Sequence, residues 1–158
     1  MRIQITTGLG EGPTQLAAFD AALLAAGVAN YNLLCLSSVI PAGAAIVRAH
    51  YQTPEDEYGF RLYVVMARHS AARAGEAAWA GLGWTQEART GRGLFVEIHG
   101  PQQAQVEGEI RASLQSMIAS RSLCYGPIES VVVGRECAGP PVCALALAVY
   151  QSAPWEAQ

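Results

Sequence analysis

Two adjacent serines, Ser37 and Ser38, follow an apolar run in the N-terminal part of the chain. The run, Tyr31–Leu36, has the composition of a buried strand, and Pro41 follows three residues after the second serine. A serine hydroxyl becomes a nucleophile when its neighbours activate it. Serine and proline are also ordinary turn residues at the ends of strands. On the dipeptide alone, the sequence predicts a strand that ends in a turn.

The absence of lysine excludes two kinds of site. All ten basic residues are arginine. A P-loop needs a lysine on the bound phosphates, so the glycine-rich segment Gly8–Thr14 is not one. Pyridoxal phosphate enzymes hold their cofactor through a lysine Schiff base, so the sequence excludes that chemistry too. An imine reaction on this protein therefore needs a carbonyl group from another source.

The segments around the serines carry a resemblance to a known family. Asn30-Tyr31-Asn32 precedes the serines, and Gly8-Leu9-Gly10-Glu11-Gly12-Pro13-Thr14 lies upstream, followed by Ala18-Phe19-Asp20-Ala21-Ala22-Leu23. Together with Ser37-Ser38 these segments resemble the pyruvoyl-dependent arginine decarboxylase family, and the resemblance covers nearly the whole chain. In that family the chain breaks itself between two such serines, and the second becomes a catalytic ketone. The resemblance therefore implies a covalent pyruvoyl cofactor made from Ser38, without pyridoxal phosphate and without a metal.

The implied cleavage is chemically reasonable for this pair. The Ser38 hydroxyl attacks the Ser37 carbonyl, and the peptide rearranges to an ester. Resonance protects a planar peptide from such an attack, and strain at the strand exit would lower the barrier. β-Elimination and hydrolysis then leave a chain of residues 1–37 and a pyruvoyl-blocked chain of residues 38–158. By the resemblance, Asn32 positions the serines or polarises the Ser37 carbonyl; from the residues alone, it is equally a strand-edge residue that bonds a loop.

Glu97 is the predicted catalytic acid. Strand alternation places Glu97 on one face with Phe95 and His99, amid apolar neighbours. A carboxylate there either points to solvent or has a raised pKa. The resemblance implies that Glu97 donates a proton to the carbanion left by decarboxylation.

Asp20 is the predicted substrate-binding acid. It falls at helical spacing between Leu16 and Leu23, within the apolar stripe, where a carboxylate needs a partner. An arginine of this chain or of a neighbouring chain is one candidate. The resemblance instead implies the guanidinium of the substrate, held by a two-pronged contact. The implied binding pocket is lined by Leu16, Leu23, Ser37 and Val39.

Composition limits the partners and the location. The 158 residues suit one domain. With 51% hydrophobic and 15% charged residues, we expect other subunits to cover some apolar surface, and the resemblance implies a homotrimer or a dimer of trimers. A net charge of -3 gives no reason to expect a nucleic acid or an anionic membrane as partner. The sequence shows no signal peptide, membrane-spanning run or zinc spacing, which predicts a cytoplasmic protein with reduced thiols.

Periodicity predicts one α+β domain, with two helices packed on antiparallel sheet in a layered sandwich. The first helix begins at Pro13-Thr14 and is capped by Gly27, and the second spans Pro101–Arg121. Gly8–Gly12 is predicted to be a tight turn, and residues 151–158 a loose tail. The predicted strands are Arg2–Thr7, Tyr31–Leu36, Ala44–Ala49, Phe60–Ala67, Gly75–Trp84, Gly93–His99, Ile128–Val133 and Val142–Tyr150. The alanine and leucine content of Gly75–Trp84 also suggests a helix, and a strand is favoured there by alternation together with the resemblance.

The predicted activity is decarboxylation of L-arginine to agmatine and carbon dioxide. Two alternatives stay open. One is a decarboxylase of another amino acid, such as ornithine or lysine, which substrate assays would distinguish. The other is a non-enzymatic relative that never cleaves and acts as a binding subunit, which the intact mass of the purified protein would distinguish.

Overall fold

The computed structural model describes residues 1–156 of the chain. Its helices are α1 (Gln15–Ala26) and α2 (Gln103–Ala119), with a short 3-10 helix η1 (Glu55–Glu57). Its strands are β1 (Arg2–Glu11), β2 (Asn32–Cys35), β3 (Val39–Ile40), β4 (Ala45–Arg48), β5 (Arg61–Ala71), β6 (Ala77–Gln86), β7 (Gly93–Gly100), β8 (Glu129–Glu136) and β9 (Val142–Ala153). Every predicted strand and helix is present, with its ends shifted by a few residues. The two-residue strand β3 was not predicted.

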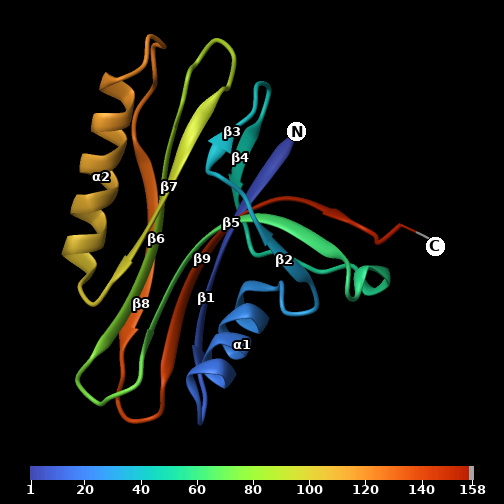
Figure 1. The fold of residues 1–158 in the computed structure, drawn as a ribbon, viewed down its shortest axis with the longest axis vertical. Helices are drawn as coiled ribbons and strands as arrows, with labels where there is room; N and C mark the ends of the chain where they lie inside the picture. The colour runs from blue at the N-terminus through green and yellow to red at the C-terminus, as the bar shows by residue number, and fades with distance from the viewer. Residues whose placement is uncertain (157–158) are drawn as a thin grey trace.

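The strands form two sheets that pack face to face. The strand order is β2-β5-β9-β1-β4 in the larger sheet and β3-β7-β6-β8 in the smaller one. Helix α1 packs on β1 and β9 of the larger sheet, and α2 packs on the smaller sheet, so that the helices lie on the outer faces (Figure 1). This confirms the predicted α+β layered fold. Two of the four strand pairs in the larger sheet, β1 with β4 and β2 with β5, are parallel, so only its long central pairs are antiparallel.

Strand β9 packs on both of its faces, toward the smaller sheet on one side and toward α1 on the other. All residues from Val142 to Val149 are buried. Because successive side chains alternate between the two faces of a strand, its alanines face the core between the sheets, whereas Cys143, Leu145 and Leu147 face the cluster beneath α1. Small side chains on the inner face allow the two sheets to approach each other closely.

The predicted tight turn at Gly8–Gly12 is wrong, because β1 continues straight through to Glu11. A Cβ atom on Gly8 would lie 2.0 Å from the carbonyl oxygen of Ala22, and one on Gly10 would lie 2.1 Å from that of Ala18. Both contacts are with helix backbone, which cannot move aside. The glycines are therefore required because α1 packs directly against the strand.

The predicted ends of the first helix are confirmed. The Thr14 hydroxyl accepts a hydrogen bond from the Ala17 amide, as an N-cap residue does. Gly27 adopts a left-handed conformation with φ 81°, and its amide bonds the last helical carbonyls. No helix within residues 1–156 has the length and apolar character needed to cross a membrane.

The prediction of a loose tail from residue 151 is wrong for residues 151–155. Strand β9 runs to Ala153, and Gln151 pairs with Tyr63. Beyond the strand, Arg61 Nη2 donates to the Pro154 carbonyl at 2.5 Å. The Trp155 indole donates to the Gly59 carbonyl at 3.0 Å. Residues up to 155 are thus held to the loop before β5, and the last two positions of the predicted tail lie outside the described residues.

Candidate active site

The two serines lie where the chain crosses from one sheet to the other. Strand β2 belongs to the larger sheet, and β3 belongs to the smaller one. Leu36 is still bonded to the larger sheet, through its amide and the Val64 carbonyl. Two residues later, the Ser38 carbonyl accepts a hydrogen bond from the Phe95 amide of the smaller sheet at 2.8 Å. The change of sheet is therefore completed at Ser37 and Ser38.

Ser38 has the backbone conformation that such a sharp crossing requires. Its φ is 36°, and it is the one residue other than glycine with a positive φ in the described chain, residues 1–156. This conformation is unfavourable for a side chain with a Cβ atom, by about 1–2 kcal/mol. The strained backbone that would lower the barrier to the predicted cleavage is thus present at Ser38, the second serine.

The Ser38 hydroxyl donates a hydrogen bond to Glu97 Oε2 at 2.6 Å. Glu97 lies on β7 with its side chain exposed, while Phe95 on the same strand is buried in the core. Both residues border a shallow hollow of about 310 Å³ between β7 and α2, which is also lined by Ser113 and Met117. A nucleophilic hydroxyl, a carboxylate and a cavity therefore meet at one point.

Sequence reasoning missed one residue beside this site, Tyr150 near the end of β9. Its hydroxyl donates to the Val39 carbonyl at 2.9 Å. Its ring packs edge-on against Phe95, with centroids 6.3 Å apart. Burial, with a smaller contribution from the charge of Glu97, raises the pKa of Tyr150 to about 12, so the hydroxyl stays protonated and able to donate at neutral pH. A single tyrosine at the end of a strand gives no signal in the sequence.

The residues predicted to bind the substrate are split between two regions. Val39 is adjacent to Ser38 and 62% exposed, and Ser37 is exposed as well. Asp20, Leu16 and Leu23 lie on α1, and none of them lines the hollow beside Ser38.

The expectation that Asp20 lies within a buried stripe of α1 is wrong. The buried positions are Ala18, Ala22 and Ala26, because the glycines of β1 draw that face of the helix onto the sheet. Asp20 is exposed, and Leu16 on the same side of the helix is 76% exposed. This surface is accessible to a ligand or to another subunit.

Asn32 lies at the start of β2, at the opposite end of the strand from the serines. Its side-chain amide donates to the Gly59 carbonyl at 2.7 Å, and its backbone amide bonds the Phe60 carbonyl. In this chain Asn32 therefore ties β2 to the loop before β5, and the structure does not bring it to Ser37.

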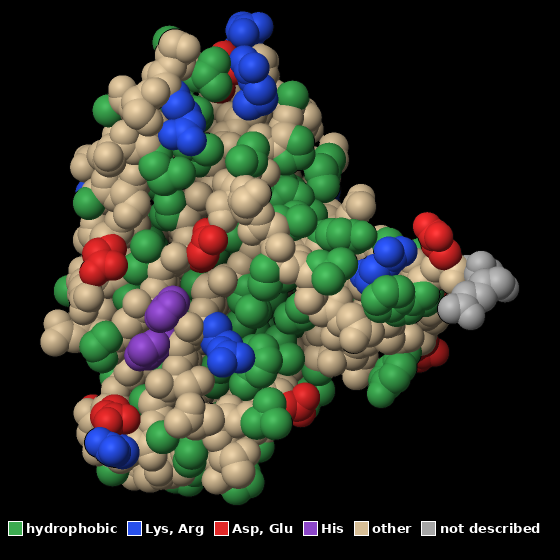
Figure 2. Space-filling model, viewed as in Figure 1, with side chains coloured by type: hydrophobic (Ala, Val, Ile, Leu, Met, Phe, Trp, Pro, Cys, Tyr) green, Lys and Arg blue, Asp and Glu red, His purple; other side chains and the backbone are tan. Residues whose placement is uncertain are grey.

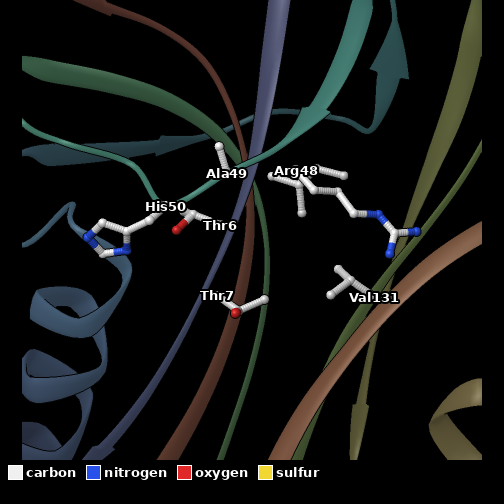
Figure 3. Close-up of a pocket in the computed structure, with 7 residues that line it drawn as sticks. Thr6, Thr7, Arg48, Ala49, His50 and Val131 are labelled. Atoms are coloured by element: carbon white, nitrogen blue, oxygen red, sulfur yellow. The ribbon is translucent and has the colours of Figure 1, made fainter.

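Of three further hollows within residues 1–156, one is lined by a predicted site residue, Val39. Another, of about 220 Å³, lies beside β1 and contains Arg48 and His50, whose side chains point away from each other in Figure 3. Arg48 is already engaged, since its guanidinium donates to the Ser130 carbonyl and lies over the Trp84 ring. Within residues 1–156, no cluster of three or more side chains is arranged to hold a metal ion.

A pair of histidines lies near Glu97. Figure 2 shows two touching histidine side chains on the face that it presents. His69 on β5 and His99 on β7 approach with their Nδ1 atoms 3.2 Å apart. Burial, followed by repulsion from His99, lowers the pKa of His69. A hydrogen bond between two imidazole nitrogens requires at least one neutral ring.

Comparison with known proteins gives one consistent result. The family model described as pyruvoyl-dependent arginine decarboxylase matches residues 2–153. A pyruvoyl-dependent arginine decarboxylase of Halobacterium salinarum is 46% identical over 97 residues, which cover 61% of this chain and 59% of the relative. That of Methanothermobacter thermautotrophicus is 41% identical over 76 residues, covering 48% of each chain. That of Thermoplasma volcanium is 35% identical over 82 residues, covering 52% of this chain and 45% of the relative. The matched part thus spans about half to three fifths of these curated relatives.

Proposed function

Because this chain belongs to the pyruvoyl-dependent arginine decarboxylase family, we propose that it cleaves itself between Ser37 and Ser38 and decarboxylates L-arginine to agmatine and carbon dioxide. The observation that carries the proposal is the hydrogen bond from the Ser38 hydroxyl to Glu97 at a residue with positive φ. A strained serine whose hydroxyl proton is already directed at a carboxylate is prepared for nucleophilic attack.

Self-cleavage would proceed in three steps at Ser37 and Ser38: attack, elimination and hydrolysis. The Ser38 oxygen attacks the Ser37 carbonyl carbon as its proton leaves, and the peptide C–N bond gives way to an ester. Elimination then breaks the bond between the Ser38 Cβ and the ester oxygen, which releases Ser37 as a carboxylate. Water converts the dehydroalanine at position 38 to a ketone and ammonia. The positive φ and the contact with Glu97 support the first step, and the residues around Ser38 fit the pyruvoyl group that would form there.

In the decarboxylation, the pyruvoyl ketone would supply the carbonyl that condenses with the substrate amine and accepts the electrons released with carbon dioxide. Glu97 holds a proton for the α-carbon from which the carboxylate departs. It borders the hollow beside Ser38, within reach of a substrate attached there. Met117 and Ile98 provide apolar side chains in the lining of this hollow. No metal and no pyridoxal phosphate is part of this proposal.

The substrate guanidinium binds Asp20, in our proposal, on a neighbouring copy of the chain. Asp20 is exposed on α1, together with the apolar side chains Leu16 and Leu24, which are 76% and 60% exposed. Val39 beside Ser38 is exposed as well. Hydrophobic side chains also gather around the centre of the face shown in Figure 2. A homotrimer, alone or paired as a dimer of trimers, would cover such surfaces and complete the pocket with Leu16, Leu23, Ser37 and Val39.

Intact mass measurement of the purified protein tests self-cleavage. Wild-type protein should give residues 1–37 and a pyruvoyl-blocked chain of residues 38–158, and Ser38→Ala should stay whole. A wild-type chain that remains whole after long incubation would instead support a non-enzymatic binding subunit. Assays with arginine, ornithine and lysine then identify the amino acid. A cytoplasmic location completes the proposal, since all four cysteines are free thiols, as in a reducing compartment.

A further inference from the structure

The Val39 carbonyl points out of the smaller sheet, on the side where β3 has no strand neighbour. Strand β3 is the edge strand of that sheet and pairs only with β7. An edge strand leaves backbone groups on its open side that need another partner. The partner here is the Tyr150 hydroxyl, which comes from β9 of the other sheet. Tyr150 therefore joins the two sheets at the point where the chain crosses between them.

The contacts around the two serines are one-sided. Before cleavage, the groups on the C-terminal side of the Ser37–Ser38 bond are held: the Ser38 hydroxyl bonds Glu97, the Ser38 carbonyl bonds the Phe95 amide, and the Val39 carbonyl bonds Tyr150. In the peptide to be cleaved, neither the Ser37 carbonyl nor the Ser38 amide has a hydrogen-bond partner within residues 1–156. The backbone that follows Ser38 is thus held by hydrogen bonds, while the peptide that precedes it is not.

From this asymmetry we infer that Tyr150 is a positioning residue for self-cleavage and decarboxylation, which holds the Val39 carbonyl and thereby keeps residue 38 aligned with Glu97. The inference rests on the proposed function. Tyr150 acts through the backbone of Val39, to which its hydroxyl donates. Its ring is fixed in turn by edge-on packing against Phe95, whose amide holds the preceding carbonyl. One aromatic pair therefore orients two consecutive carbonyl groups.

Tyr150→Phe removes the donor and keeps the ring. Losing one neutral hydrogen bond corresponds to about a 2- to 12-fold effect. We expect self-cleavage to slow by that factor. The rate is measured from the intact mass of the protein at successive times after cell-free synthesis. In fully cleaved enzyme, we expect kcat for arginine to fall while KM changes little. Tyr63→Phe is the matched control, because Tyr63 lies on the adjacent strand opposite Gln151 and its hydroxyl has no hydrogen-bond partner within residues 1–156.

A second variant separates positioning from general destabilisation. Tyr150→p-aminophenylalanine keeps the ring and a donor, so it should restore the cleavage rate to within about 2-fold of wild type. If Tyr150→Phe does not fold, this variant alone decides the question, and slow cleavage by it would overturn the inference. Equal cleavage rates for wild type and Tyr150→Phe would also overturn it, while leaving the proposed function intact. A wild-type chain that never cleaves would overturn both.

Discussion

Glu97 is the residue whose chemistry the structure defines most sharply, because its carboxylate is in direct contact with the Ser38 hydroxyl. Glu97→Gln keeps the shape and removes the transferable proton. We expect arginine decarboxylation per cleaved chain to fall by about 10²- to 10⁴-fold, as for the loss of a general acid. Glu136→Gln, an exposed carboxylate on β8, is the control and should turn over normally. Full activity in Glu97→Gln would mean that another group protonates the product.

Asp20 offers a test of substrate choice. A planar guanidinium makes two parallel hydrogen bonds to a carboxylate, whereas an ammonium binds as a point charge. Asp20→Asn should therefore weaken kcat/KM for arginine by about 1.5–3 kcal/mol, the range for a charged hydrogen bond. Asp56→Asn in the exposed η1 segment should have no effect. Equal losses for arginine, ornithine and lysine would show that Asp20 has no part in selecting arginine.

The His69–His99 pair predicts a pH dependence of stability. The pKa of His69 is lowered in the folded state, so the unfolded chain binds more protons between that value and about 6.5. The contribution of His69 to the free energy of unfolding should therefore fall as the pH drops through this window and stay constant above it. His69→Gln should reduce the difference in melting temperature between pH 7.5 and pH 5.5, and His50→Gln, outside the pair, should not. Identical pH profiles for wild type and His69→Gln would exclude this role of the pair.

How far the sequence predicts single residues depends on whether their partners are local. Ser38 and Glu97 were named through the resemblance to a known family, since a serine pair alone predicts a turn and a strand acid alone predicts an exposed side chain. Tyr150 could not, since its partner lies 111 residues away and is a backbone carbonyl that any residue would supply. Asp20 was misplaced because the buried face of α1 is set by the glycines of β1 rather than by the largest apolar side chains of the helix.

At the scale of elements, the contact between α1 and β1 can be tested with two glycine-to-alanine substitutions that should have opposite effects on stability. Gly10→Ala drives a methyl group into helix backbone and should lower the free energy of unfolding by about 1–3 kcal/mol. Gly108→Ala, in the exposed middle of α2 with no atom within 4 Å of the added group, should raise it by about 0.5–1 kcal/mol. Urea denaturation reports both values. A Gly10→Ala variant that is as stable as wild type would mean that α1 does not pack on β1 as described.

The positions of the long strands followed from alternation, and helix α1 followed from its capping residues. The errors concern features that only the folded molecule determines. Gly8–Gly12 has the composition of a turn, but its glycines serve a contact with a helix that follows later in the chain. Strand β3 has two residues, which is too short to show any period, so the crossing between the sheets could not be predicted.

At the scale of the whole molecule, the exposed face of α1 predicts a larger assembly. Light scattering should give three times the 16.7 kDa chain mass, or six times for paired trimers. Leu16→Arg adds a charge to the 76% exposed position and should dissociate the assembly and lower activity together. Ala112→Arg, which adds the same single charge at an exposed position of α2, is the control on another surface. A monomeric wild-type enzyme with full activity would exclude a site shared between subunits.

The position of β1 inside the larger sheet would also change the unfolding reaction of the cleaved protein. Residues 1–37 contain β1, which is hydrogen-bonded to β9 on one side and β4 on the other, and they contain α1 as well. Cleavage at Ser38 would therefore leave an internal strand attached by non-covalent contacts alone. Melting of the cleaved protein would then be a dissociation, whose midpoint rises with protein concentration. In dilute solution the two pieces would rarely meet again, so the lifetime of the cleaved protein would be set by the rate of dissociation rather than by an equilibrium.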